Sequence, residues 1–147
     1  MPFLPILKKP EKLVVDANPI LSALLGGKAK RLFLEADILE FAVAESALAE
    51  VQAYVPKMAQ KLGVSHEFLF YALELLPLTV CAPKMYRRSL QKAKMQIAHR
   101  DPRDVDVLAL ALALERPLWT NDRDFDDTMA QVLTTAELLA IYFPRSS

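Results

Sequence analysis

The sequence predicts an α/β domain in which helices cover both faces of a mostly parallel sheet of about five strands. Short apolar runs alternate along the chain with longer segments in which apolar residues recur at helical spacing. Strands that are almost continuously apolar are typical of parallel sheets buried on both faces, which gives a three-layer α/β/α arrangement. The 147 residues, 53% of them hydrophobic, are sufficient for one domain with a sizeable core.

The predicted strands are short and rich in apolar and β-branched residues. They are residues 12–15, 38–43, 78–82, 117–120 and 131–133. The first strand ends directly before Asp16, and the fourth leads into the polar segment 120–124. Cys81, the single cysteine, falls at the end of the third strand and is expected to be a small residue of the core.

Helices are predicted between these strands from apolar spacing and from residues that begin or end helices. They cover residues 18–24, 29–36, 46–60, 66–76, 84–98, 101–115 and a last helix from residue 134. Asn18 and Pro19 fit the N-cap and first position of the first helix. Pro56 is expected to bend or interrupt the third helix. Thr134 and Glu137 have the spacing of a capping box.

Charge balance and cysteine content limit the class of protein. Eighteen basic residues balance eighteen acidic ones, which argues against a protein that coats nucleic acid through positive charge. An enzyme whose acidic site binds cations remains compatible with this balance. A single cysteine excludes an internal disulfide and favours a cytoplasmic location. No apolar run approaches the ~20 residues of a membrane span, and the proline-rich residues 1–11 are expected to form an N-terminal arm.

Two acidic residues follow predicted strands, where open α/β sheets commonly bind ligands. Asp16 follows the first strand and Asp122 lies just beyond the fourth, so both carboxylates meet at one edge of the sheet if these strands are neighbours. Clustered carboxylates repel one another unless one is protonated or a cation lies between them. Mg²⁺ and Mn²⁺ prefer oxygen ligands of this kind. Taken alone, each aspartate is more often a turn former.

Two further acids are candidates for the same site. Asp101 and Pro102 fit the N-cap and first position of the predicted helix 101–115, which places Asp104 at its third position. A carboxylate there stabilises the helix dipole and can also belong to a site. Glu50 has small and aromatic helical neighbours, so it borders the buried face of its helix. Asp106 faces elsewhere on its helix and is expected to be solvated or paired.

Other chemistries find little support in the sequence. His66 and His99 have no cysteine or histidine partners at zinc-ligand spacing. The three glycines form no phosphate-binding loop, and Ser22 and Ser46 have no evident histidine base. A shared carboxylate–metal site and ordinary capping therefore remain as the two interpretations of the acids.

Four segments, in this order along the chain, resemble the PIN domain family of nucleases. They are Val14-Val-Asp16-Ala-Asn18, Ala47-Leu-Ala-Glu50-Val, Asp101-Pro-Arg-Asp104 leading into an alanine- and leucine-rich helix, and Pro117-Leu-Trp-Thr-Asn-Asp122-Arg-Asp124-Phe125. Each motif is loose by itself, but their order is quite specific. The similarity spans about residues 12–143, which defines the expected PIN-like nuclease domain.

The resemblance implies a central parallel sheet of five strands and a ribonuclease site that depends on Mg²⁺ or Mn²⁺. The three core acids of the family match Asp16, Glu50 and Asp104, and its fourth acid matches Asp122. Asp16, Asp104 and Asp122 are the implied metal ligands, some of them through water, while Glu50 completes the metal shell or orients the attacking water. Three further positions match supporting residues of the family pattern, namely Asn18, Thr120 and Asp124.

A run of basic residues precedes Asp104. Four of them fall at helical spacing in the predicted helix 84–98 and are candidates for one basic face: Lys84, Arg87, Arg88 and Lys92. A solvated helix face is the ordinary explanation of such a pattern. Contact with the RNA backbone or with an acidic partner is the sharper alternative.

Small PIN proteins of this kind are commonly toxins of VapBC-type toxin–antitoxin pairs, which form homodimers and are inhibited by a partner protein. The resemblance therefore implies an RNA substrate, an antitoxin partner and a homodimer, although an RNA-processing nuclease without a toxin role fits equally. Another metal-dependent phosphoesterase or DNA nuclease and a non-catalytic interaction domain also remain open. A haloacid-dehalogenase-like enzyme is not supported, because residues 16–18 lack the second acid of that class.

Overall fold

Five parallel strands form the central sheet, in the order β3-β2-β1-β4-β5. The structure is a computed structural model that describes residues 9–97 and 101–145. The strands are β1 Lys12–Val15, β2 Glu40–Ala44, β3 Leu78–Cys81, β4 Leu118–Trp119 and β5 Val132–Leu133. The predicted parallel sheet of five strands is therefore confirmed.

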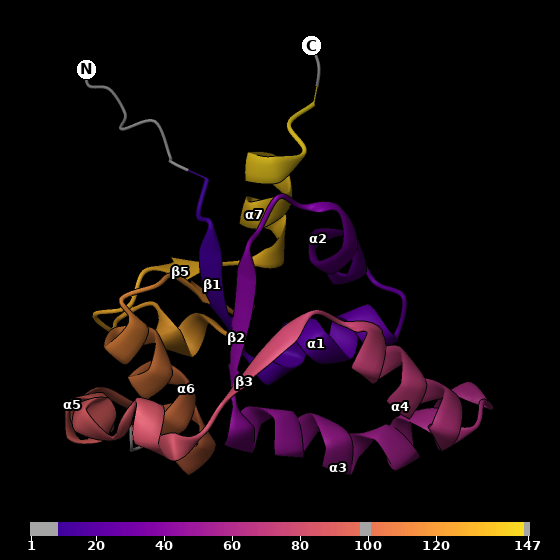
Figure 1. Cartoon of the computed structure of the whole chain (residues 1–147), viewed down its shortest axis with the longest axis horizontal. Coiled ribbons are helices and arrows are strands. Elements are labelled where there is room, and N and C mark those ends of the chain that lie inside the picture. The colour runs from indigo at the N-terminus through magenta and orange to yellow at the C-terminus, as the bar shows by residue number, and fades with distance from the viewer. Residues whose placement is uncertain (1–8, 98–100, 146–147) are drawn as a thin grey trace.

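Helices cover both faces of this sheet and complete the three predicted layers. They are α1 Ala17–Leu24, α2 Ala29–Glu35, α3 Glu45–Leu62, α4 His66–Leu75, α5 Leu90–Ile97, α6 Pro102–Leu114 and α7 Thr135–Tyr142. In Figure 1, α5 and α6 lie on one side of the strands, and α1, α2 and α4 lie on the other. The capping box of α7 is present as predicted, between Thr134 and Glu137.

The core is built on the two central strands that also carry the candidate site. The side chains of β1 after Lys12 are fully buried, and Trp119 of β4 packs against Phe33 and Phe41 with ring centroids 4.7 and 6.0 Å away. Val15 lies opposite Trp119 in the pairing of β1 with β4. The residues that follow these two strands are thereby held beside each other at one edge of the sheet.

Helix α1 begins earlier than the sequence indicates. Its N-cap is Asp16 and not Asn18: the backbone of Asp16 is extended, and its carboxylate accepts a hydrogen bond of 2.8 Å from the amide of Ala17. Aspartate caps helices as well as asparagine does, and Asp16 stands where the chain leaves the strand. Pro19 then lies inside the first turn, where its missing N–H has no intrahelical partner to lose.

The predicted helix over residues 84–98 is wrong in its first half. Two 3-10 turns, Pro83–Met85 and Arg87–Ser89, precede α5. Tyr86 lies between the turns, is only 1% exposed, and donates a hydrogen bond of 2.8 Å to Asp106 of α6. Burial of this large side chain outweighs the helix propensity of its polar neighbours. Residue 98, the last of the predicted helix, lies outside the described residues.

Pro56 was expected to bend or interrupt the third helix, but α3 continues through it without interruption. Pro56 and Gln52, whose carbonyl loses its helical partner, are both exposed, so water can replace the hydrogen bond that proline removes. The helix ends at Gly63, whose left-handed conformation (φ 70°) is typical of a glycine C-cap.

Most of the predicted N-terminal arm, residues 1–8, lies outside the described residues. The end of the arm contacts the domain: the amide of Leu39 donates a 2.7 Å hydrogen bond to the carbonyl of Glu11, and the hydroxyl of Tyr142 donates to the carbonyl of Pro10. Among the described residues, no helix is long and apolar enough to cross a membrane.

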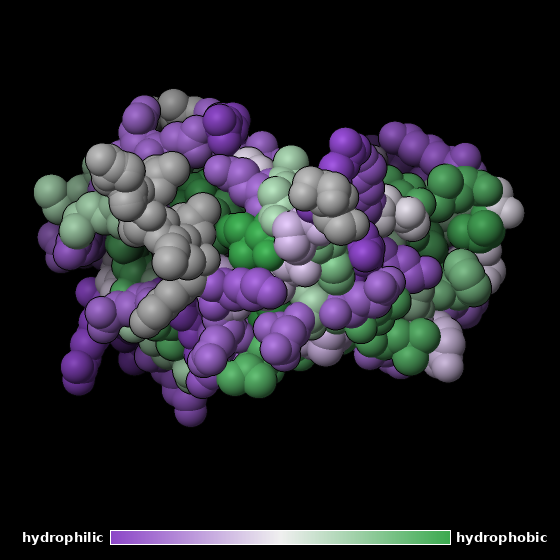
Figure 2. All heavy atoms as spheres, turned by 90° about the horizontal axis from the view of Figure 1, so that it is seen from above, coloured by the Kyte–Doolittle hydropathy of each residue, from purple (hydrophilic) through white to green (hydrophobic). Residues whose placement is uncertain are grey.

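One part of the surface is markedly apolar. Phe68, Tyr71 and Leu75 of α4 are each about 60% exposed, and hydrophobic residues gather at this end of the molecule in Figure 2. These three side chains recur at helical spacing, so they form one face of α4. An apolar face of this kind is typical of a surface that meets a partner.

Candidate active site

Asp16 lies at the centre of the candidate site, at the carboxyl end of β1. Its side chain is 7% exposed, and both carboxylate oxygens accept hydrogen bonds, Oδ1 from the amide of Ala17 and Oδ2 from the hydroxyl of Thr120, each 2.8 Å long. Burial raises the pKa of Asp16, these two hydrogen bonds oppose the rise, and the charges of Asp122 and Asp101 add to it. The negative charge of this fixed carboxylate therefore favours a nearby cation.

Asn18 and Thr120 connect the ends of β1 and β4. The side-chain nitrogen of Asn18 donates to Asp16 Oδ2 at 3.3 Å and to Thr120 Oγ1 at 3.2 Å. Its side-chain oxygen accepts a 3.1 Å hydrogen bond from the amide of Asn121. Thr120 is fully buried and accepts a 3.0 Å hydrogen bond from the amide of Asp122. Both residues thus hold the first and fourth acids of the site in one hydrogen-bonded network.

Asp122 combines the two roles considered from the sequence. It caps the 3-10 turn Arg123–Phe125, because its Oδ1 accepts a 2.9 Å hydrogen bond from the amide of Asp124. Its charge also raises the pKa of Asp16 and of Asp104. Asp122 is half-buried at the site, whereas Asp124 is exposed.

Asp104 has the most unfavourable charge among these carboxylates. It is half-buried in the first turn of α6, as the sequence predicts. Burial is the largest cause that raises its pKa, which reaches about 7. The negative charges of four other carboxylates contribute the rest, and these belong to Asp16, Asp101, Asp122 and Glu50. Acids from four separate segments, namely the end of β1, α3, the start of α6 and the residues after β4, therefore lie close enough to act on one another.

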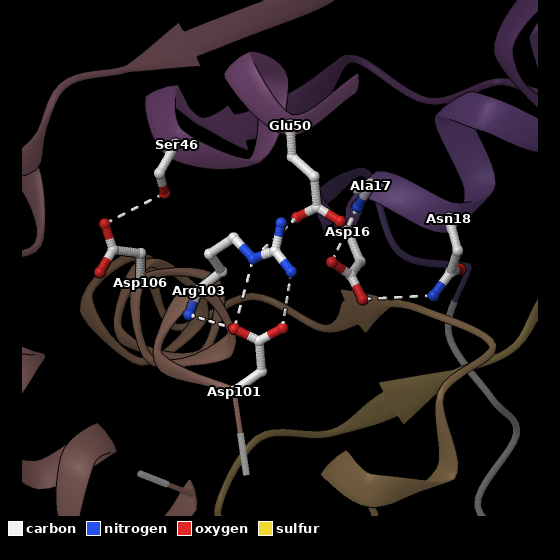
Figure 3. A network of polar contacts seen from close by, with 8 residues as sticks. All are labelled: Asp16, Ala17, Asn18, Ser46, Glu50, Asp101, Arg103 and Asp106. Carbon is white, nitrogen blue, oxygen red and sulfur yellow. Dashed lines mark hydrogen bonds and ion pairs between the residues drawn. The ribbon is translucent and has the colours of Figure 1, made fainter. Parts of the chain in front are cut away.

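Glu50 reaches the same cluster from α3. Figure 3 shows its carboxylate directed toward Asp16 and the guanidinium of Arg103. Glu50 Oε1 lies 3.9 Å from Arg103 Nε. Burial raises the pKa of Glu50, Arg103 lowers it, and the charges of Asp16 and Asp101 raise it further. Its place at the border of the buried face, inferred from its neighbours along the helix, agrees with its half-buried side chain.

Asp101 is a member of the cluster that the sequence analysis did not propose. It is the predicted N-cap of α6 and accepts a 3.0 Å hydrogen bond from the amide of Arg103. Its charge also raises the pKa of Asp16, Glu50 and Asp104. The one sequence signal for its place in the cluster is its spacing from Asp104, because residues three apart lie on the same face of a helix.

Asp106 was expected to be either solvated or paired, and the structure shows that it is paired. It accepts hydrogen bonds from the hydroxyl of Tyr86 at 2.8 Å and from that of Ser46 at 3.1 Å. Ser46 and Glu50 lie one turn apart on α3, and Asp106 and Arg103 lie one turn apart on α6. The two helices thus contact each other through two neighbouring polar pairs (Figure 3).

The predicted basic face is not the face of one helix. Lys84 lies in the first 3-10 turn, Arg87 and Arg88 lie in the second, and Lys92 alone lies in α5. All four side chains are exposed. Their spacing in the sequence suggested one helix face, but the four residues are divided between two 3-10 turns and α5. Their contact with RNA or with an acidic partner stays a prediction.

The carboxylates fit a hard divalent cation by their chemistry and by their mutual repulsion. Their oxygens are the donors that Mg²⁺ and Mn²⁺ prefer, and a dication relieves the charge that raises the pKa of Asp104. In the described part of the chain, no three acidic, histidine or cysteine side chains stand ready as a complete ligand set. Mg²⁺ keeps several waters and commonly binds through one or two carboxylates, so a complete set is not required.

The sequence matches the PIN domain family over residues 14–141, nearly the whole chain. The chain therefore belongs to the PIN domain family, whose nucleases are hydrolases that act on nucleic acids and generally use divalent metal ions. This agrees with the resemblance found in the four sequence motifs. No curated protein matches the sequence.

Chains in three solved structures have a similar fold. The first is VapBC2 of Rickettsia felis bound to a DNA fragment from their promoter, with a TM-score of 0.66 and 17% identity over 84% of this chain and 98% of that chain. The second is a toxin-antitoxin complex from Klebsiella pneumoniae, with a TM-score of 0.62 and 20% identity over 84% of this chain and 97% of that chain. The third is DNA-bound VapBC from Salmonella typhimurium, with a TM-score of 0.65 and 15% identity over 84% of this chain and 98% of that chain. At these identities the likeness concerns the fold.

Proposed function

We propose that this protein is a metal-dependent endoribonuclease whose catalytic residues are Asp16, Glu50, Asp104 and Asp122. The observation that carries the proposal is the position of Asp104: burial and the surrounding carboxylates raise its pKa to about 7. Such a cluster, at the carboxyl edge of a parallel sheet, is typical of a functional site. Membership of the PIN family supports phosphodiester hydrolysis as the reaction.

In this proposal Asp16, Asp104 and Asp122 hold the metal, directly or through water. A bound Mg²⁺ or Mn²⁺ supplies a water of lowered pKa and neutralises charge on the phosphodiester. Thr120 and Asn18 fix the orientation of Asp16 through their hydrogen bonds to its Oδ2, as residues behind metal ligands commonly do. Glu50 completes the metal shell or orients the attacking water, and Asp124 is a supporting acid near the edge of the site.

The test is cleavage of a defined RNA and the matching DNA, each with Mn²⁺ or Mg²⁺ and then with excess chelator. We expect RNA cleavage that chelation abolishes and that Asp16→Asn reduces at least a thousandfold, on the order of what removal of a catalytic group costs. Asp37→Asn is the matched control, because Asp37 is exposed and precedes β2 at the opposite edge of the sheet.

Four results would contradict the proposal in different ways. Cleavage of DNA alone would assign the site to a DNA nuclease, and metal-dependent release of phosphate from small esters alone would assign it to another phosphoesterase. Absence of both cleavage and Mn²⁺ binding would favour an interaction domain in which the acids have structural roles. Unchanged cleavage by Asp16→Asn would remove Asp16 from the catalytic residues.

We further propose that this nuclease is the toxin of a toxin–antitoxin pair and acts as a homodimer. The named VapBC structures of similar fold support the first part. The exposed apolar face of α4, formed by Phe68, Tyr71 and Leu75, offers a surface that a partner or second copy can bury. Induced expression should arrest bacterial growth, the neighbouring gene should relieve the arrest, and light scattering should give twice the chain mass. Growth without arrest, despite RNA cleavage, would indicate an RNA-processing nuclease.

A further inference from the structure

Arg103 occupies an unusual position for a basic residue, because it lies among the acids of the candidate site. It belongs to the first turn of α6, between Asp101 and Asp104 in the sequence. Its Nε lies 3.9 Å from Glu50 Oε1, and its charge lowers the pKa of Glu50. In Figure 3 the guanidinium stands between the carboxylates of Glu50 and Asp101. Arg103 therefore places a positive charge where the chain otherwise gathers negative ones.

Asp101 fixes the orientation of this guanidinium. Arg103 Nε donates to Asp101 Oδ1 at 3.3 Å, and Nη2 donates to Oδ2 at 3.0 Å, so the pairing is bidentate. The amide of Arg103 donates to the same carboxylate. A bidentate pair holds the plane of an arginine far better than a single contact does. Asp101 thus anchors Arg103 through its side chain and its backbone.

The anchored guanidinium still has donors to offer. The side chain of Arg103 is 58% exposed, and its hydrogen bonds to Asp101 use only Nε and Nη2 of the guanidinium. Within residues 9–97 and 101–145, no acceptor bonds to Nη1. An exposed planar donor group of this kind matches the oxygens of a phosphate.

The site needs such a donor. A polyanionic strand is repelled by five clustered carboxylates, and one divalent ion neutralises only part of their charge. Arg103 lowers the pKa of Glu50, and its own pKa is raised by its hydrogen bonds to Asp101 and by the charges of Glu50, Asp101 and Asp104. The exposed Lys84, Arg87, Arg88 and Lys92 are on other segments.

We propose that Arg103 binds a backbone phosphate of the nucleic-acid substrate beside the carboxylates, and that Asp101 is the residue that positions it. This inference rests on the proposed function and adds a substrate-binding residue to it. The alternative is that Arg103 serves only as a counter-ion for Glu50 and Asp101. The two ideas predict effects of opposite sign, because a counter-ion competes with the metal whereas a phosphate ligand assists the substrate.

The test uses the full chain and a fluorescently labelled single-stranded RNA, with binding measured in Mn²⁺ by anisotropy over a range of salt concentrations. All variants carry Asp16→Asn so that the RNA stays intact. Arg103→Gln should weaken binding about tenfold and lower the slope of log affinity against log salt by about 0.7, the value for one phosphate contact on a single strand. Arg103→Lys should restore most of the salt slope but only part of the affinity.

Arg31→Gln is the matched control. Arg31 has a similarly exposed side chain, 53%, and an acidic partner, Glu35, but it lies on α2. It should bind RNA as the parent does. Asp101→Asn gives a second test, because it removes a negative charge from the site. If Asp101 only repels RNA, binding becomes tighter; if it positions Arg103, binding becomes weaker.

Titration with Mn²⁺ alone and cleavage rates in the otherwise native chain complete the test. Arg103→Gln should leave the Mn²⁺ affinity within about twofold and raise KM more than it lowers kcat. Tighter Mn²⁺ binding with faster cleavage, or an unchanged salt slope, would overturn the proposal and leave Arg103 as a counter-ion. Failure of the proposed function is distinct, since the native chain would then cleave no RNA at all.

Discussion

Asp104→Asn should stabilise the metal-free protein at neutral pH, although it removes a proposed catalytic residue. The pKa of Asp104 rises from an ordinary 3.8 to about 7 in the folded chain. A tenfold change in proton affinity corresponds to about 1.4 kcal/mol, so the charge of Asp104 opposes folding by at most about 4 kcal/mol. Because the side chain is half-exposed, screening by solvent reduces this to about 2 kcal/mol.

The sign of the pH dependence follows from the direction of this change. The folded chain binds the Asp104 proton more tightly than the unfolded chain does. Protonation of Asp104 therefore stabilises the folded state, and this stabilisation is complete below about pH 4, where the carboxyl is protonated in both states. It is lost as the pH rises toward 7, through the raised pKa, and the free energy of unfolding should fall over that interval. Asparagine carries no charge at any of these pH values, so this part of the decline should disappear.

Urea unfolding at pH 5 and pH 8, in excess chelator, measures the effect. The native chain should lose about 1 kcal/mol more between these pH values than Asp104→Asn does, because the rest of the effect is already lost below pH 5. Asp37→Asn serves as the control, because Asp37 lies away from the cluster. Equal pH dependence in the native chain and Asp104→Asn would refute the reasoning that repulsion and burial at Asp104 prepare the site for a cation.

Three other changes test the surroundings of the site. Tyr86→Phe removes the 2.8 Å hydrogen bond to Asp106 and should lower the free energy of unfolding by about 2 kcal/mol; an unchanged urea midpoint would show that this bond contributes nothing. Thr120→Val removes the donor to Asp16 and should reduce kcat/KM by about 10- to 100-fold, with the acid limb of the pH–rate profile moved upward; an unmoved limb would contradict this. Reversing the charges of Arg87 and Arg88 should weaken RNA binding and lower its salt slope, whereas a merely solvated surface leaves both unchanged.

The fold could be predicted because the strands of a doubly covered sheet are apolar enough to stand out. β1 and β4 are buried on both faces, and that burial requires the uniformly apolar runs that the sequence shows. The start of α1 was wrong for a local reason: Asn18 and Pro19 suit a helix start, but Asp16 caps first because the strand ends there. Local propensity does not reveal which of two good caps the tertiary structure uses.

The candidate site was predicted in part because its acids stand at strand and helix ends. Asp101 was left out because capping α6 already explained it, and a sequence does not show that a cap also faces other carboxylates. The position of Arg103 depends on the packing of α3 against α6, which brings Glu50 within 3.9 Å. Glu50 and Arg103 are far apart in the sequence and meet only because the two helices pack together. The spacing of residues within one segment cannot predict such a contact.

Asp16 closes the first strand, caps the first helix and carries the central carboxylate of the site. A replacement there changes chemistry and folding together, unless the new side chain keeps the cap. Asparagine keeps an oxygen for the amide of Ala17, whereas alanine removes it at a cost of about 1 kcal/mol. An alanine variant of this residue would therefore confuse lost catalysis with a loosened helix. Experimentalists who need an inactive but intact protein should choose asparagine at this position.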